Sequence, residues 1–215
     1  MDIIPFVRFT LNSRFIGRWI MGGVIFFIPF IDFFSIGYLS RASRTMMTGG
    51  MGLPIWDRKA EIWIEGLKQL FVFILYEAVP FFLFSFGFFL TALHRFTAFF
   101  GTIVTYLGFI ALLIFSFFLP FAFAVFAEEM DFRKALEFER IFNAIKEVFF
   151  HYTVGYIAIL LLIGLFYITI LKIPYFIGFF LFSILTYYVF LIGIYYYAQL
   201  FVKTSLSSVR IRDNV

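Results

Sequence analysis

Four long apolar segments constrain the fold of this chain more than any other feature. Residues 96–127 and 173–202 contain no charged side chain. Glu77 is the only charged residue within 69–93, and residues 148–171 contain no Asp, Glu, Lys or Arg. A helix needs about 20 apolar residues to cross the hydrocarbon core of a bilayer. We therefore predict four membrane-spanning helices, near residues 69–92, 97–126, 149–171 and 175–201.

The overall composition indicates an integral membrane protein and excludes several kinds of chemistry. Hydrophobic residues make up 63% of the chain and charged residues 14%, with a mean hydropathy of +1.01. One soluble core of this size cannot hide so much apolar surface. The absence of cysteine excludes disulfides, thiolate metal sites and cysteine nucleophiles. Membrane topology accounts for the net charge of +4, so we expect no nucleic-acid partner.

The sequence leaves open the path of the first apolar segment. Its uncharged core, residues 19–31, makes roughly 20 Å of helix, which is shorter than a bilayer core of about 30 Å. Either residues 15–39 span the membrane with Asp32 inside, or the chain turns back at Pro29 as a re-entrant hairpin. The hairpin puts fifteen of the 17 Lys and Arg residues on one side, and a full crossing puts twelve there. Because basic residues favour the cytoplasmic side, we prefer the hairpin and keep a fifth span as the alternative.

Two amphipathic helices are predicted in the long basic loops. The first is expected to begin near Pro54, with Trp56 and Trp63 on an apolar face at helical spacing. The second covers residues 128–147 and presents Phe132 and Leu136 on one face. We expect both helices to lie at the cytoplasmic interface, with these aromatic and aliphatic side chains at the contact between them.

Together these features predict an all-α integral membrane protein of one domain, residues 1–215. It is a four-span helical bundle with an N-terminal re-entrant hairpin, or fifth span, and two cytoplasmic amphipathic helices. The expected location is the cell (cytoplasmic) membrane, with the long loops and the C-terminus in the cytoplasm. Its segments are the N-terminal interfacial or hairpin part (1–40), a cytoplasmic loop with an amphipathic helix (41–68), two spans (69–127), the second amphipathic helix (128–147), two further spans (148–202) and a cytoplasmic tail (203–215).

Several short motifs follow one another along the chain. They are Gly37-Tyr38 followed by arginines, Leu53-Pro54-x-x-Asp57, Gly66-Leu67-Lys68, Tyr76 with Pro80, and Phe132-Arg133-x-Ala135. Their order and spacing resemble the domain-of-unknown-function 4013 family of prokaryotic multi-pass membrane proteins over nearly the whole chain. The chain departs from that pattern by Ile55-Trp56, where an acidic residue is common, and by its 38 phenylalanines. The resemblance implies a prokaryotic cell-membrane protein and brings no activity with it.

Asp32 and Glu77 are the acids that lie inside apolar segments. A carboxylate within a membrane span is costly, so each is a candidate proton or cation carrier, or a partner for a buried base. The alternative places Asp32 at a hairpin turn or helix end, and Glu77 near the cytoplasmic headgroups. That alternative carries more weight for both residues.

We expect the remaining candidate residues to have structural and not functional roles. Asp57, Glu61 and Glu65 repeat every four residues and could hold a divalent cation, but a solvated helix face explains them better. His94 and His151 are expected at opposite membrane faces, where they cannot act together. We therefore predict no metal, no cofactor and no catalytic residue.

Small residues form a further pattern in the second predicted span. Gly101, Thr105 and Gly108 lie at positions i, i+4 and i+7, which lets another helix approach closely. We favour packing inside the bundle over a dimer seam.

From these features we expect a non-enzymatic membrane protein with an accessory, scaffold or membrane-organising role. The alternative is a small transporter or channel that uses Asp32 and Glu77. The expected partner is the lipid bilayer, with another membrane protein or a second copy of the chain as open alternatives.

Overall fold

The computed structural model describes residues 3–50, 52–170, 172–205 and 207. These residues fold into helices joined by short turns, and no strand occurs among them. The helices are α1 (Ile4–Thr10), α2 (Ser13–Phe26), α3 (Asp32–Met47), α4 (Lys59–Leu93), α5 (Arg95–Ser116), α6 (Leu119–Glu129), the short 3₁₀ helix η1 (Lys134–Leu136), α7 (Phe138–Glu147), α8 (Phe149–Ile170) and α9 (Tyr175–Val202).

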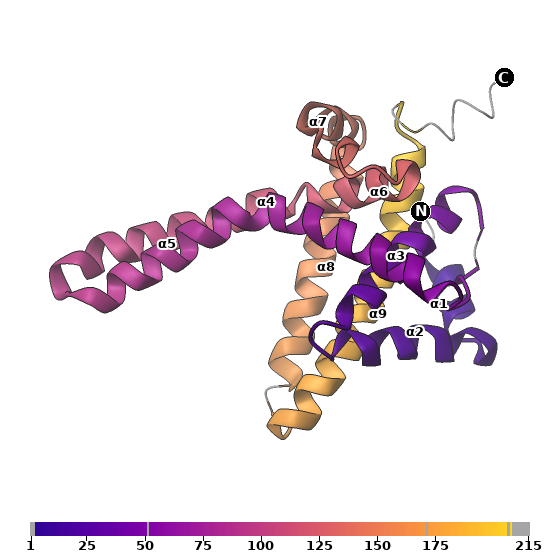
Figure 1. Ribbon diagram of the computed structural model, residues 1–215, viewed down its shortest axis with the longest axis horizontal. Coiled ribbons are helices and arrows are strands. Elements are labelled where there is room, and N and C mark those ends of the chain that lie inside the picture. The colour runs from indigo at the N-terminus through magenta and orange to yellow at the C-terminus, as the bar shows by residue number, and fades with distance from the viewer. Residues whose placement is uncertain (1–2, 51, 171, 206, 208–215) are drawn as a thin grey trace.

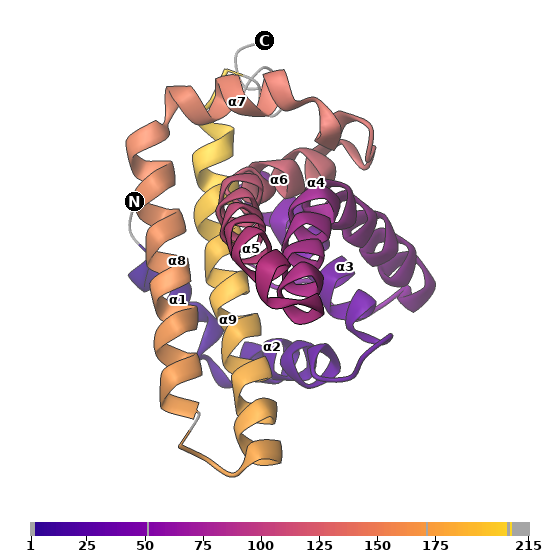
Figure 2. The same cartoon turned by 90° about the vertical axis from the view of Figure 1, so that its left-hand side faces the viewer.

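Four stretches are long and apolar enough to cross a membrane: Lys59–Leu93, Arg95–Glu129, Phe149–Ile170 and Tyr175–Val202. This confirms the predicted number of apolar helices and makes the protein an all-helical membrane protein. Helices α4 and α5 form one antiparallel hairpin, called the arm below, and α8 and α9 form a second (Figure 1). The arm leaves the body sideways, across the direction of α8 and α9, and is seen nearly end-on in Figure 2.

The first predicted amphipathic helix starts later than expected. The prediction that a helix begins near Pro54 is wrong, because α4 begins at Lys59 and the preceding Arg58 has a left-handed backbone, with φ of 48°. From Lys59 the helix continues without interruption to Leu93, through Pro80. The predicted surface helix and the predicted first span are therefore one helix of 35 residues. Trp56 lies before it, in a non-helical segment.

The second predicted span and the helix after it are also divided differently. The span ends as α5 at Ser116 and resumes as α6 at Leu119, with Pro120 in the first turn of α6. A single helix over 128–147 is wrong, since α6 stops at Met130, whose φ is 57°, and η1 and α7 follow. Pro120 suits the first turn of a helix, where its missing N–H would have no intrahelical partner, whereas Pro80 lies inside α4 and leaves that helix continuous.

Tyrosines of α8 satisfy the backbone where α5 ends. The Tyr156 hydroxyl donates to the carbonyl of Leu113 over 3.1 Å, and the Tyr152 hydroxyl donates to the carbonyl of Phe117 over 2.5 Å. The Leu113 carbonyl also accepts from the backbone N–H of Phe117. The Phe117 carbonyl lies at the helix end, where carbonyls have no partner within the helix. In an apolar environment such groups need a partner from within the protein. The two tyrosines thereby fasten the arm to the α8–α9 hairpin.

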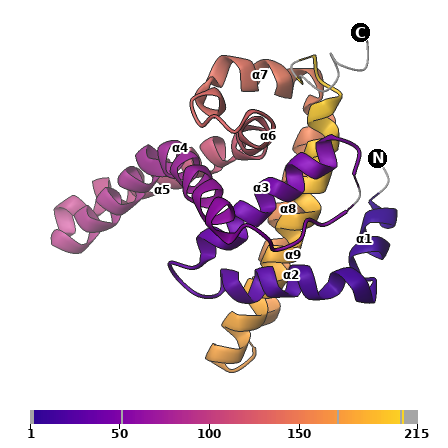
Figure 3. The ribbon, with the colours of Figure 1, turned by 45° about the vertical axis from the view of Figure 1, so that its right-hand side comes forward.

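The N-terminal segment is a helical hairpin that packs on α9. A turn that contains Pro29 joins α2 to α3, and Phe30 in that turn has φ of 69°. Figure 3 shows α2 below α3, with α9 behind them. Helix α9 also contacts α3, α6 and α8, so it lies at the centre of the body. Buried side chains of α3, α6 and α9 form most of the core.

Candidate functional site

Helices α3 and α4 touch backbone to backbone at a pair of glycines. A Cβ added to Gly37 would fall on the carbonyl oxygen of Ile62, and one added to Gly66 would fall on that of Phe33. Only glycine allows two helix backbones to come this close. The crossing therefore fixes which side chains of α3 face α4. It lies near the N-terminal end of α4 (Figure 3).

One turn beyond the crossing, Arg41 of α3 holds three carboxylates. Its guanidinium lies 3.5 Å from Asp57, 3.0 Å from Glu61 and 3.1 Å from Glu65. The Arg41 and Glu65 side chains are only 13% and 10% exposed. Among the described residues, no group of His, Cys, Asp and Glu side chains is arranged to hold a metal ion. The acids that we weighed as cation ligands are thus ion-paired to Arg41.

The segment between α3 and α4 is fastened by aromatic side chains. The Tyr38 hydroxyl donates to the carbonyl of Pro54 over 2.9 Å, and the Trp56 indole N–H donates to the carbonyl of Arg18 over 3.0 Å. The two rings stack, with centroids 4.1 Å apart. The Arg18 guanidinium donates to the carbonyl of Leu53. Burial raises the pKa of the Tyr38 phenol, and nearby Arg18 opposes this effect, so Tyr38 stays a neutral donor.

These contacts correct the predicted role of the tryptophans. Trp56 was expected on an apolar helix face toward the second amphipathic helix, but it lies in the non-helical segment and stacks on Tyr38. Trp63 is on α4 and is 39% exposed, so its ring lies at the outer surface. The reason is that α4 starts at Lys59, so Trp56 lies in the non-helical segment before the helix and Trp63 lies on the helix.

A second group of contacts joins α4 to the segment after α6. The Tyr76 hydroxyl donates to the carbonyl of Ala135 over 2.9 Å, and Phe132 packs edge to face on Phe71 with ring centroids 5.8 Å apart. Leu136 is partly buried against the core. Phe132 thus contacts α4 at Phe71, beyond the predicted first amphipathic helix. The hydrogen bond of Tyr76 is buried, whereas Phe71 is 49% exposed, so the ring contact lies at the surface of α4.

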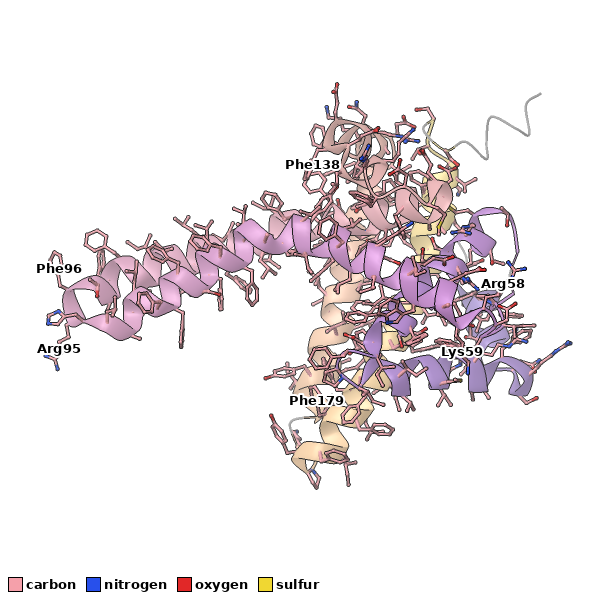
Figure 4. All side chains as sticks on the ribbon, in the orientation of Figure 1. Arg58, Lys59, Arg95, Phe96, Phe138 and Phe179 are labelled. Carbon is pink, nitrogen blue, oxygen red and sulfur yellow. The ribbon has the colours of Figure 1, made fainter. Side chains whose placement is uncertain are left out.

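Arginines and lysines hold the end of α6. The Arg44 guanidinium donates to the carbonyl of Ala127 over 2.9 Å and contacts the sulfur of Met130. Glu129 pairs with Lys134 at 3.0 Å and with Arg140 at 2.5 Å. These contacts cover the last carbonyls of α6 and fix the turn toward α7. Figure 4 shows the polar side chains gathered around the body, while phenylalanine rings surround the arm.

The small residues of α5 pack against α4. A Cβ added to Gly101 would meet Thr91, and one added to Gly108 would meet the backbone of Phe84. Thr105 lies against Gly87 of α4. The predicted stripe of Gly101, Thr105 and Gly108 therefore faces the other helix of the arm.

Asp32 lies at a helix end. It is the first residue of α3, directly after the turn that joins α2 to α3, and it is partly exposed. A helix N-terminus favours a negative charge. This is the position that the alternative interpretation of Asp32 described.

Glu77 is the buried carboxyl in the middle of α4. The residue is 6% exposed, and neither carboxylate oxygen has a hydrogen-bond partner among the described residues. It lines a groove of about 680 Å³ between α4 and α5. Asp32 lies beside the crossing at Gly66, and Glu77 lies about 16 Å further along α4 at about 1.5 Å per residue. The two carboxylates belong to separate places in the fold.

The two histidines are far apart, as predicted from their positions. His94 caps the start of α5 at the tip of the arm, next to Arg95 (Figure 4). His151 is in the first turn of α8, where its carbonyl accepts a hydrogen bond from the Tyr196 hydroxyl. Two such side chains cannot form one catalytic or metal site.

The motif residues quoted above thus meet in the fold, at the α3–α4 crossing and at the contact of Tyr76 with Ala135. Comparison with protein families gives the same result over most of the chain, since the family described as "Protein of unknown function (DUF4013)" matches residues 20–175. The chain belongs to the DUF4013 family. No curated protein matches it, and no solved structure matches it. The resemblance noted in the sequence is therefore confirmed.

Arg41 is the residue of this DUF4013 protein whose role sequence reasoning missed. Asp57, Glu61 and Glu65 were compared only with the nearby bases of the same segment, and the residue that pairs with all three comes from α3. A usable signal was present. Arg41 follows Gly37 by one helical turn, and Glu65 precedes Gly66 directly. If the two glycines mark a helix crossing, Arg41 and Glu65 fall beside it.

Proposed function

We propose that this DUF4013 protein sits in the cytoplasmic membrane of a prokaryotic cell, with the body at the inner side and the tips of both hairpins outside. The tips carry the two connections with few basic residues, Arg95 in one and Lys172 in the other. The charged loops lie around the body (Figure 4). Basic residues are enriched in cytoplasmic loops, which supports this orientation. The α2–α3 hairpin would then be re-entrant from the inner side.

The arm lies across the direction of α8 and α9 (Figure 1). Both hairpins can therefore cross the same bilayer only if the arm bends toward the direction of α8 and α9. Two places in the chain allow such a bend. One is the break between α5 and α6 at Phe117, and the other is Pro80 within α4. Prolines and interrupted hydrogen bonding are the usual causes of helix kinks. Along the arm α4 and α5 pack mainly on each other, and Tyr156 of α8 contacts α5 at Leu113 and Ser116.

Single cysteines test the orientation, because the chain has none of its own. We would place them at Ser13, Thr48, Ala98 and Glu139 and label intact cells with a membrane-impermeant maleimide. The proposal expects labelling at Ala98 and protection at the other three positions. Labelling at Ser13 together with Ala98 would replace the hairpin by a fifth span. Ser207 is unsuitable as a probe because it is buried, so protection there carries no information about sidedness.

As its role, we propose a non-enzymatic accessory or scaffold protein that organises lipid or other membrane proteins around its hairpins. The observation behind this proposal is that the polar residues of the motifs bind other segments of the same chain. Arg41 binds three acids, Tyr38 binds Pro54 and Tyr76 binds Ala135. Each of these contacts holds two segments of the chain together. The remaining surface offers large apolar side chains along both hairpins.

Photo-cross-linking in native membranes tests this role. A benzophenone amino acid would replace Phe89 of α4, which is 56% exposed, and Leu161 of α8, which is 68% exposed. The same substitution at the buried Phe121 is the control. A discrete protein adduct at Phe89 or Leu161, absent at Phe121, is expected. Adducts to lipid alone at both positions would contradict a protein partner on the hairpins and would leave only the lipid-organising form of the proposal.

The unpartnered carboxyl of Glu77 supports a second candidate, a small transporter or channel. Proteoliposomes with a trapped pH dye separate the two functions. The scaffold proposal expects the same proton leak from wild type, Glu77→Gln and Asp32→Asn. A flux that is present in wild type and lost in Glu77→Gln would favour the transporter.

A further inference from the structure

Glu77 has a buried carboxyl group that no described residue hydrogen-bonds. Only 6% of the residue is exposed, and both carboxylate oxygens lack a hydrogen-bond partner among the described residues. An ionised carboxylate that is buried without a partner is strongly unfavourable. It therefore requires either a proton or a cation. Among the described residues that line the groove beside it, none is basic.

The groove itself has the size and lining of a ligand site. Its volume of about 680 Å³ falls within the range of about 300–1,000 Å³ that is usual for small-molecule sites. Aromatic rings of Phe73, Phe81 and Phe82 and the aliphatic Ile74 and Leu112 form its walls. The rings of Phe81 and Phe82 are 63% and 66% exposed, so the groove opens on the outer side of the arm.

Hydroxyl groups lie in the groove and next to it. Ser116 lines the groove, and its hydroxyl lies 2.5 Å from that of Tyr156 on α8. These hydroxyls can accept hydrogen bonds from a bound ammonium group but carry no charge themselves. The site thus combines one negative charge, neutral hydroxyls and aromatic faces.

We propose that this groove binds an amphipathic cation, a molecule with an apolar or aromatic body and a single positive charge. The charge pairs with the Glu77 carboxylate, which gives up its proton to solvent when the cation binds. The faces of the phenylalanine rings attract the same cation. The apolar body fills the groove and removes both the rings and the ligand from water or lipid. The site stands whether or not the protein acts as a scaffold, because binding requires no transport.

Equilibrium dialysis of the purified full-length protein in a non-ionic detergent tests the site, with tetraphenylphosphonium as the probe. We expect Glu77→Gln, which keeps the shape of the side chain, to weaken binding by about tenfold or more. Asp32→Asn is the matched control and should change the affinity by less than about twofold. Neutral triphenylphosphine oxide should bind wild type and Glu77→Gln equally. Glu77→Asp, which keeps the charge, should bind tetraphenylphosphonium more tightly than Glu77→Gln.

Three results would overturn the proposal. Equal binding of tetraphenylphosphonium to wild type and Glu77→Gln would show that the carboxylate plays no part. An equal loss in Asp32→Asn would assign the effect to overall charge. A detergent-solubilised dimer that Glu77→Gln converts to monomer would assign the groove to a second copy of the chain. A melting temperature of each variant close to that of wild type establishes that the comparison is between folded proteins.

Discussion

The α3–α4 crossing predicts that a single methyl group at Gly37 destabilises the whole body. In Gly37→Ala the new Cβ would overlap the carbonyl oxygen of Ile62, and it would lie 2.8 Å from the backbone nitrogen of Gly66. Both are backbone atoms of α4, so no side-chain rotation relieves the overlap. The helices have to move apart. Such a movement also weakens the ion pairs of Arg41, one turn away on α3.

The expected loss can be worked out from two opposing effects. Forcing an extra methyl into a packed interior costs typically about 1–3 kcal/mol, and the backbone contact here argues for about 3 kcal/mol. Alanine is a better helix former than glycine by about 1 kcal/mol. The net destabilisation is therefore about 2 kcal/mol. For a chain of this size each kcal/mol lowers the melting temperature by about 2–4 °C, so a fall of about 4–8 °C is expected.

Thermal unfolding in detergent, followed by tryptophan fluorescence, measures this effect. Trp56 stacks on Tyr38, the neighbour of Gly37, so its emission reports directly on the crossing. Gly164→Ala in α8 is the matched control, because nothing lies within 4 Å of a Cβ added there. That variant should melt at or slightly above the wild-type temperature. If Gly37→Ala melts no lower than Gly164→Ala, the two backbones are not in contact and the reasoning fails.

The polar contacts of the body give two further predictions. Arg41→Ala leaves the buried Glu65 without its partner and should cost about 3–5 kcal/mol, whereas Glu61→Ala, at a side chain that is 54% exposed, should cost about 1 kcal/mol or less in the same unfolding assay. Equal effects would mean that Glu65 is hydrated. Tyr76→Phe removes the donor to the carbonyl of Ala135 and should cost about 1–2 kcal/mol, with faster proteolysis of the loop that carries Ala135. An unchanged cleavage rate would show that other contacts hold this loop.

The apolar helices were predictable from the sequence because the bilayer sets a simple condition. Any segment of about 20 apolar residues can form a span, and its ends are marked by charge or proline. The last two predicted spans, 149–171 and 175–201, agree with α8 (Phe149–Ile170) and α9 (Tyr175–Val202). Their ends coincide with Glu147 and with Pro174, where the pattern changes abruptly.

Helix boundaries inside the polar segments were not predictable, because tertiary contacts decide them. Pro54 suits a first helical position, and the apolar spacing from Trp56 onward fits a helix. In the fold, however, Tyr38 binds the carbonyl of Pro54 and Arg18 binds that of Leu53. These partners come from α2 and α3. The segment is therefore held in a non-helical form, and α4 begins only after Arg58.

The break after α6 has a similar origin. Residues 128–147 have the composition of one amphipathic helix, but Met130 adopts a left-handed backbone, which ends α6. Arg44 of α3 reaches the end of α6 and contacts Met130. A residue more than eighty positions earlier in the sequence thus contributes to where this helix stops. No local pattern contains that information.

The two intramembrane carboxylates show why a site needs more than a residue type. In the sequence, Asp32 and Glu77 are alike, each a single acid among apolar neighbours. In the fold, Asp32 begins α3, where the helix N-terminus favours its charge. Glu77 lies in the middle of α4, where the nearby backbone N–H groups bond within the helix and Pro80 has no N–H to donate. One oxygen of Asp32 and both oxygens of Glu77 are buried without a hydrogen-bond partner among the described residues, but Asp32 is partly exposed at a helix N-terminus. The need for an external partner is therefore greater at Glu77, and the aromatic groove beside it makes a cation with an apolar body the partner to test.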